Sequence, residues 1–191
     1  MYLKEWKALK RQVETIEISS LEELYLIQFH QLLIAGEDHR FMHHNGVDLI
    51  ALCRATWKTL FCNKREGGST IAMQLVRVLT GKYEKTLSRK ILEIYLAIRI
   101  TNYLPRNKII SMYLSLAYFG WKMDGLKEAI NQLGLVHNDL SLRDIASIIA
   151  RLKYPEPKYF SKEKEHLIMM RTNHILFRYE KLHIGKSYGS L

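Results

Sequence analysis

The sequence predicts an all-α protein, and three observations support this. Apolar residues recur at helical spacing in several segments, and no series of alternating, strand-like segments is present. Only 3 prolines and 10 glycines occur among the 191 residues, too few for an all-β chain with many tight turns. A chain of this length normally forms one domain.

The predicted helices follow one another with short connections. Residues 1–19 form an amphipathic lead-in. The first long helix begins at Ser19 and Ser20, because serine is a good cap and acidic residues follow in the first turn. Its apolar positions continue until the chain reaches Glu37. Further helices are predicted over 48–60, 69–79, 86–100, 105–117, 126–135, 141–152 and 162–180.

The charge balance narrows the classes of partner. Lysine and arginine number 29 against 19 acidic residues, a formal net charge of +10. Such an excess favours a nucleic acid, an anionic membrane surface or a phosphorylated substrate. Nucleic acid has no further support, because the basic residues are dispersed and no zinc-finger or RNA-binding signature occurs.

The cysteines and the apolar runs allow predictions about thiol chemistry and about membrane-spanning or export segments. Cys53 and Cys62 match no metal or redox motif, so free, buried thiols are predicted. No apolar run approaches the roughly 18 residues that cross a bilayer. The first residues also lack the apolar core of a secretory signal. We therefore expect neither a transmembrane segment nor an export signal in this sequence.

The first candidate site is the run Gly36–Asp48, which combines acidic residues, histidines, an arginine and a glycine turn. Glu37 and Asp38 stand where an apolar helix ends, and a partly desolvated carboxylate there suits a general base. The alternative interpretation is an acidic helix end followed by a polar loop.

The second candidate is the segment 67–77, in which two glycines lead into a helix capped by Ser69 or Thr70. A helix N-terminus with free N–H groups attracts anions. Thr70, Gln74 and Arg77 share one helical face and suit a phosphate or a sugar. An ordinary capped helix with a solvated face is the alternative.

Two further segments complete the set. Glu93 follows Arg89 by four residues and Lys90 by three, so the three side chains can meet on one helix face. They form either a surface ion pair or a cationic clamp around an acid beside a bound anion. The segment 113–120 is rich in aromatic residues and leucine and is predicted to be core.

In this order, the four segments resemble the motifs of the peptidoglycan glycosyltransferase domain, glycosyltransferase family 51. That domain occurs in bifunctional penicillin-binding proteins and in monofunctional transglycosylases. The resemblance implies a lysozyme-like, all-α fold with a small membrane-facing jaw subdomain. It implies a catalytic domain over 20–180, between the lead-in and a tail over 181–191. The matching residues are Glu37, Asp38, Phe41, His44, Gly46 and Asp48, then Gly67, Ser69, Thr70, Ile71, Gln74 and Leu75, then Arg89, Lys90 and Glu93, and finally Tyr113, Leu114, Tyr118, Phe119 and Gly120.

The resemblance also implies a reaction. Such enzymes transfer a saccharide from a polyprenyl diphosphate, a lipid II-like donor, to the 4-hydroxyl of an acceptor glycan with inversion, and so build peptidoglycan strands. Glu37 corresponds to the general base, and Glu93 to a second catalytic carboxylate near the donor diphosphate. The sequence requires no cofactor, and a divalent cation (Mg or Mn) at the diphosphate is compatible with the family. The implied donor-binding residues are Ser69, Thr70, Gln74, Arg77, Arg89 and Lys90, and the implied supporting residues are Asp38, Phe41, His44 and Gly46.

The sequence departs from the family pattern at Ala72, Met73, Val78, Ser115 and Asp144. These departures leave other functions open. One is a transferase acting on a different undecaprenyl-diphosphate oligosaccharide, of capsule or O-antigen type. The others are a lysozyme-like enzyme that cleaves glycans and a non-enzymatic protein that binds membranes or glycans.

The jaw implies a membrane partner. The apolar residues of the segment 49–61, with Lys58, Lys64 and Arg65, either dip into an anionic membrane surface or pack in the core. By resemblance, we expect the protein at the extracytoplasmic (periplasmic) face of the cytoplasmic membrane. Cell-envelope biosynthesis proteins are further expected partners. The apolar residues in question are Leu49, Ile50, Leu52, Trp57, Leu60 and Phe61.

Overall fold

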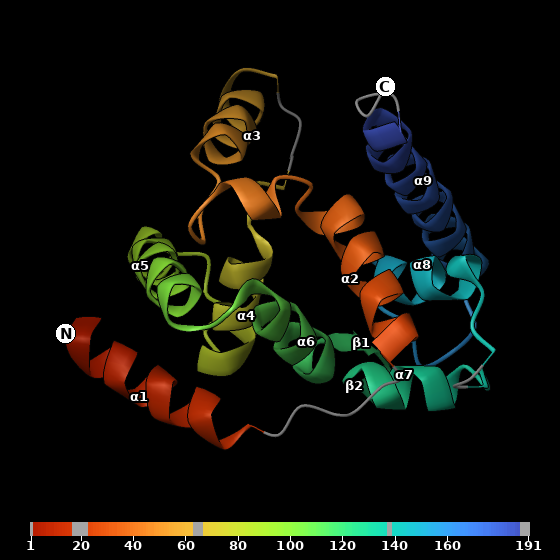
Figure 1. Ribbon diagram of the computed structural model, residues 1–191, viewed down its shortest axis with the longest axis horizontal. Helices are drawn as coiled ribbons and strands as arrows, with labels where there is room; N and C mark the ends of the chain where they lie inside the picture. Colours follow the sequence, from red (N-terminus) through yellow and green to blue (C-terminus); the bar gives the residue numbers. More distant parts are fainter. Residues whose placement is uncertain (1, 17–22, 63–66, 137–138, 188–191) are drawn as a thin grey trace. The chain divides into compact units, whose positions relative to one another are not determined.

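The computed structural model describes residues 2–16, 23–62, 67–136 and 139–187, and helices dominate them (Figure 1). The predicted all-α class is confirmed. The elements within these residues are α1 (Tyr2–Thr15), α2 (Glu23–Glu37), the 3-10 helix η1 (Phe41–His43), α3 (Leu49–Phe61), α4 (Ile71–Thr80), α5 (Leu87–Tyr103), α6 (Arg106–Leu116), β1 (Tyr118–Gly120), β2 (Met123–Asp124), α7 (Leu126–Gln132), α8 (Leu142–Ala150) and α9 (Lys162–Ser187).

The chain forms two compact units. The first contains the described residues of 1–17 and 40–113, and the second contains those of 18–39 and 114–191. The second and third motifs and most of the first lie in the first unit. Glu37 and Asp38 of the first motif lie in the second unit, as does the fourth motif except for Tyr113. Each unit is therefore described by itself.

In the first unit, α4 packs against α5, and α1 contacts both. Trp6, Leu9 and Val13 recur at helical spacing on α1 and are buried. The amphipathic lead-in predicted from the sequence is thus a helix with a buried stripe. The proposed division of the chain at residues 19 and 20 stays a prediction. The predicted helix start at Ser19 and Ser20 lies outside the described residues, as do Lys64 and Arg65.

In the second unit, α2, α8 and α9 pack against one another in pairs. Phe29, Leu32 and Leu33 of α2 are fully buried. Gly36 lies so close to α9 that a Cβ there would be 3.1 Å from the Ile175 side chain. This close packing fixes the C-terminal end of α2, where Glu37 stands.

A short antiparallel ribbon of β1 and β2 was not predicted from the sequence. Gly120, with a φ of 148°, lies against the segment around Glu156, and a Cβ would be 2.4 Å from the Glu156 nitrogen. The Glu156 N–H donates to the Phe119 carbonyl at 2.9 Å, and the Trp121 N–H donates to the Glu156 carbonyl at 2.9 Å. A glycine at this position lets the later segment pair with β1.

Other details correct or explain the sequence analysis. Cys53 and Cys62 are free, but both are exposed, so the prediction of buried thiols is wrong. Asp144 forms a capping box with Ser141 at the start of α8, which gives this departure from the family pattern a structural role. In the described parts of the chain, no helix has the length and apolar character needed to cross a membrane.

Candidate active site

The carboxylate of Glu93 is the centre of a buried cationic cluster. Glu93 lies on α5, and only 3% of its side chain is exposed. Arg77 of α4 binds both of its oxygens, with Nη2 at 2.9 Å from Oε1 and Nε at 3.2 Å from Oε2. Lys90 donates to Oε1 at 3.0 Å, and Arg89 donates to Oε2. The predicted meeting of Arg89, Lys90 and Glu93 is confirmed, and Arg77 joins them from another helix.

The hydroxyl of Ser69 extends this cluster. Its Oγ accepts hydrogen bonds from Lys90 Nζ at 3.0 Å and from Arg77 Nη2 at 3.3 Å. Three cations and one carboxylate leave two net positive charges. An excess of fixed positive charge in a partly desolvated place attracts anions, and an anion with two negative charges matches this cluster.

Burial and charge act in opposite directions on Glu93. Burial by itself would raise the pKa of Glu93, but the hydrogen bonds and charges of Arg77 and Lys90 outweigh it and hold this pKa below its ordinary value. Burial lowers the pKa of Lys90 despite the neighbouring carboxylate, and the charges of Arg77 and Arg89 add to that effect. Glu93 is therefore a carboxylate at neutral pH.

Residues of the second motif form hydrogen bonds with residues of the first and fourth motifs. Thr70 is buried, donates to the Gly46 carbonyl at 2.6 Å and accepts from the Met73 N–H at 3.2 Å. It is thus the cap of α4, as predicted for Ser69 or Thr70. Gln74 accepts a hydrogen bond from the Tyr113 hydroxyl. A direct contact of Thr70 or Gln74 with a donor stays a prediction.

The first-motif loop lies against α5 and α6. Arg106 donates to the carbonyls of Phe41 and His44 at 2.9 and 2.8 Å, and Phe41 is fully buried. Gly46 has a φ of 89°, and a Cβ there would be 2.3 Å from the Ala97 carbonyl oxygen. These contacts are consistent with the supporting roles that the sequence suggested for Phe41, His44 and Gly46.

Asp48 connects this loop to α3. Its Oδ1 accepts from the N–H groups of Ile50 and Ala51 at 3.0 and 3.1 Å, and its Oδ2 lies 3.0 Å from Arg40. Burial would raise the pKa of Asp48, but the Ala51 N–H, the Arg40 charge and the other donors lower it. The ionised carboxylate therefore caps α3.

Glu37 has a partner from α9. Nη2 of Arg171 donates to Glu37 Oε1 at 2.8 Å and to the Gly36 carbonyl at 2.7 Å. Both side chains are mostly buried. Asp38 is buried as well, and its N–H donates to the Ile34 carbonyl at 3.0 Å. The ion pair with Arg171 orients the Glu37 carboxylate at the end of α2.

Sequence analysis missed Arg171, although a signal was present. Arg171 stands three residues after Ile168 and four before Ile175. Both isoleucines are buried, so an arginine at this spacing points to the interior and requires a partner. Arg171 lies on the apolar face of one predicted helix, so it could have been paired with Glu37, the acidic residue at the end of another predicted helix.

The departures from the family pattern have different surroundings. Ala72 and Met73 are fully buried in the core of the first unit, whereas Val78 and Ser115 are half-buried. The side chains of Ala72 and Met73 therefore do not lie on the surface, where a substrate could contact them. Their effect is on packing.

The described residues fit a divalent cation poorly. Both oxygens of Glu93 already bind cationic side chains. In the parts of the chain that the structure describes, no group of three histidine, cysteine or acidic side chains is placed to bind a metal. Among the described residues, the Glu93 carboxylate is thus already occupied by cations, although a cation bound to a diphosphate could use one or two carboxylates.

Comparisons with known proteins agree with the motifs. A sequence profile described as Transglycosylase matches residues 4–180. Penicillin-binding protein 1A of Escherichia coli is 39% identical over 124 residues, which cover 64% of this chain and 15% of that protein. Penicillin-binding protein 1A of Pseudomonas aeruginosa is 35% identical over 156 residues, 81% of this chain and 19% of that protein. A monofunctional glycosyltransferase of Staphylococcus saprophyticus is 36% identical over 98 residues, 51% of this chain and 36% of that protein.

The matched region thus spans only 15% to 36% of the length of these three relatives. The profile, in contrast, covers nearly the whole chain and includes all four motifs. This chain belongs to the transglycosylase family.

Proposed function

We propose that the protein is an inverting glycosyltransferase that polymerises a polyprenyl-diphosphate-linked saccharide, a lipid II-like donor, into a peptidoglycan strand. The observation that carries this proposal is the buried cluster of Arg77, Arg89 and Lys90 around Glu93. Two net positive charges beside the Ser69 hydroxyl suit a departing diphosphate.

The chemistry needs a base and a charged site for the leaving group. In the proposed reaction, Glu37 takes the proton from the 4-hydroxyl of the acceptor, whose oxygen bonds to the anomeric carbon of the donor. The bond from that carbon to the diphosphate oxygen breaks, and its electron pair leaves with the diphosphate. The cationic cluster stabilises this charge. A diphosphate is a good leaving group, so no general acid is required.

The charge around Glu93 bears on the glycan-cleaving alternative. Hydrolysis of a glycosidic bond by two carboxyl groups requires that one of them be protonated to donate to the leaving oxygen. Because the cations hold the pKa of Glu93 below its ordinary value, Glu93 itself does not suit that role. The two net positive charges of the cluster suit a diphosphate leaving group, which hydrolysis of a finished glycan does not release.

The exposed apolar side chains of α3 support contact with a membrane surface. Leu49, Ile50, Trp57 and Phe61 are all exposed, so the alternative of core packing is wrong for these four. The rings of Trp57 and Phe61 contact each other, with centroids 4.2 Å apart and planes inclined by 34°. Aromatic and aliphatic side chains near basic residues partition into anionic interfaces. We propose that this surface holds the protein at the membrane that contains its substrate.

Polymerisation assays test the function directly. The protein is incubated with lipid II in detergent and, separately, with an undecaprenyl-diphosphate oligosaccharide of capsule type. We expect polymer from lipid II, and a loss of at least about a hundredfold for Glu37→Gln, as expected when a general base is removed. Glu163→Gln, an exposed position in the first turn of α9, is the matched control.

The outcomes separate the alternatives. Polymer formed only from the other oligosaccharide assigns the enzyme a different saccharide. Cleavage of finished glycan, or full activity of Glu37→Gln, contradicts the proposed mechanism. Vesicle flotation with anionic vesicles tests the membrane surface: Trp57→Ser should reduce binding, and equal binding by this variant would contradict the proposed role of α3.

A further inference from the structure

We infer that the groove between α8 and α9 is a second saccharide site, which binds an uncharged glycan segment. The groove contains a pocket of about 460 Å³, within the range of small-molecule sites. Its lining comes from α8, from α9 and from the segment that joins them. None of the lining residues belongs to the four motifs, so this site is separate from the catalytic assignments above and does not depend on them.

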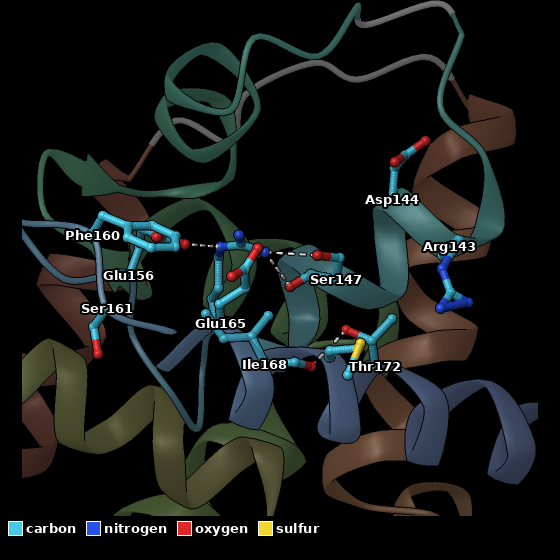
Figure 2. Close-up of a pocket in the computed structure, with 11 residues that line it drawn as sticks. Arg143, Asp144, Ser147, Glu156, Phe160, Ser161, Glu165, Ile168 and Thr172 are labelled. Carbon is cyan, nitrogen blue, oxygen red and sulfur yellow. Dashed lines mark hydrogen bonds and ion pairs between the residues drawn. The ribbon is translucent and has the colours of Figure 1, made fainter. Parts of the chain in front are cut away.

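Arg151 lines the pocket and is held in place by two other lining residues. Its Nε donates to Glu156 Oε2 at 2.7 Å, and its Nη1 donates to the carbonyl and the hydroxyl of Ser147 at 2.9 and 2.7 Å. Only 12% of the Arg151 side chain is exposed. Figure 2 labels Glu156 and Ser147 and marks their interactions with dashed lines. The arginine is a preorganised donor.

Several polar groups of the pocket are still available. Among the described residues, Nη2 of Arg151 and the carboxylate of Glu165 make no hydrogen bond or ion pair, and Oε1 of Glu156 accepts none. One donor group therefore stands with two acceptor groups. A hydroxyl both donates and accepts, so neighbouring sugar hydroxyls satisfy such a set.

The charge of the pocket selects against ions. Two arginines and three carboxylates line it, which leaves a net charge of −1. An anion would meet this excess of carboxylates, and a cation would meet the Arg151 guanidinium. Asp144 is already used in the capping box of α8, and Arg143 donates to Asn173. A neutral, hydroxyl-rich ligand is the class that fits.

An exposed aromatic ring in the lining, that of Phe160, supplies the apolar contact that sugar recognition also needs. Phe160 lines the pocket and is 76% exposed, and Figure 2 shows it at the end opposite Arg143 and Asp144. The neighbouring Tyr159 and the nearby Trp121 are exposed as well, and Lys158 Nζ lies 5.2 and 4.9 Å from their ring centroids. Exposed rings beside a few convergent polar groups can cover the C–H face of a sugar ring.

Ligand-observed NMR with the N-acetylglucosamine tetramer chitotetraose, an uncharged β-1,4-linked probe, tests the inference. We expect binding to the unmodified protein, and about tenfold weaker binding for Phe160→Ala and for Glu165→Gln. Both residues are exposed, so unchanged thermal unfolding should accompany the loss. Phe177→Ala and Glu163→Gln are matched controls on α9 outside the pocket, and both should bind as the unmodified protein does.

The catalytic variant Glu37→Gln distinguishes this site from the proposed active site. Binding of the tetramer that survives Glu37→Gln but not Phe160→Ala supports the inference, whether or not the protein polymerises lipid II. Three results would overturn it: no binding of the tetramer, binding by Phe160→Ala and Glu165→Gln as tight as that of the unmodified protein, or loss of binding in Glu37→Gln alone. Competition of the tetramer by inorganic phosphate at the same site would also overturn it, because it would reveal an anion pocket.

Discussion

Removing the Arg77 charge should weaken binding of a diphosphate without unfolding the protein. In Arg77→Met, Glu93 keeps Arg89 and Lys90 as partners, so its carboxylate stays paired. The net charge of the cluster falls from +2 to +1. The lost hydrogen bonds to a charged group should cost about 2 kcal/mol in the free energy of unfolding.

The loss of affinity follows from electrostatics. At an effective dielectric constant of about 20, one charge about 6 Å from an anion contributes 332/(20 × 6), or about 3 kcal/mol. Arg77 is 29% exposed, so solvent and salt screen part of this interaction. A remaining contribution of about 1.5 to 2 kcal/mol corresponds to binding that is about 10- to 30-fold weaker.

Isothermal titration calorimetry with pyrophosphate at low and high ionic strength measures this effect. Lys108→Met is the matched control, because it removes one positive charge from an exposed position on α6 outside the cluster. We expect near-normal binding by the control and a smaller difference between the variants at high salt. Equal binding by Arg77→Met and the unmodified protein would refute the reasoning. Equal losses in both variants would show that only the overall charge of +10 attracts the anion.

Three further changes test the supporting structure. Arg171→Met should lower the polymerisation rate about tenfold, because Arg171 positions Glu37, and it should leave pyrophosphate binding unchanged. Arg171→Lys should restore part of that rate. An unchanged polymerisation rate in Arg171→Met would exclude a positioning role. Asp48→Ala should lower stability to urea by about 2 kcal/mol through loss of the α3 cap and its ion pair. Folding lowers the pKa of Asp48 below its ordinary value of 3.8. The loss of stability in Asp48→Ala should therefore be complete above pH 3.8 and should shrink as the pH falls through the lowered pKa of the folded protein. A loss of stability that does not depend on pH would contradict this assignment. Gly46→Ala should cost about 3 kcal/mol, because its φ is 89° and its Cβ would meet the Ala97 carbonyl oxygen; wild-type stability of this variant in urea would contradict the close approach.

The sequence predicted helices well because each helix is determined locally. Apolar spacing, a serine or threonine cap and a following glycine all lie within one segment, as at Thr70 and Gly81 around α4. The β1–β2 ribbon was missed for the opposite reason. It is only a few residues long, and Gly120 pairs with Glu156 from a distant part of the chain. No local pattern contains that pairing.

The same distinction applies to the candidate site. Arg89, Lys90 and Glu93 share one turn of α5, so their meeting could be predicted from spacing alone. The ion pair of Arg77 with Glu93 joins two helices, and that of Arg171 with Glu37 joins residues 134 positions apart. Spacing within one helix indicates that Arg171 needs a partner, but it does not identify the partner in either pair, because both pairs depend on how helices pack. The exposure of Cys53 is likewise a property of tertiary structure.

The contacts of the second motif indicate what the cationic cluster recognises. Ser69 already accepts hydrogen bonds from Lys90 and Arg77, and Gln74 already accepts one from Tyr113. These groups are therefore arranged before any ligand arrives, which suits stabilisation of a charge that develops during the reaction. A cluster of fixed cations recognises phosphate oxygens and does not distinguish one sugar from another. Since Ala72 and Met73 are buried, the departures there do not supply that distinction either. The choice between lipid II and another polyprenyl-linked saccharide must therefore be made by residues that contact the sugars.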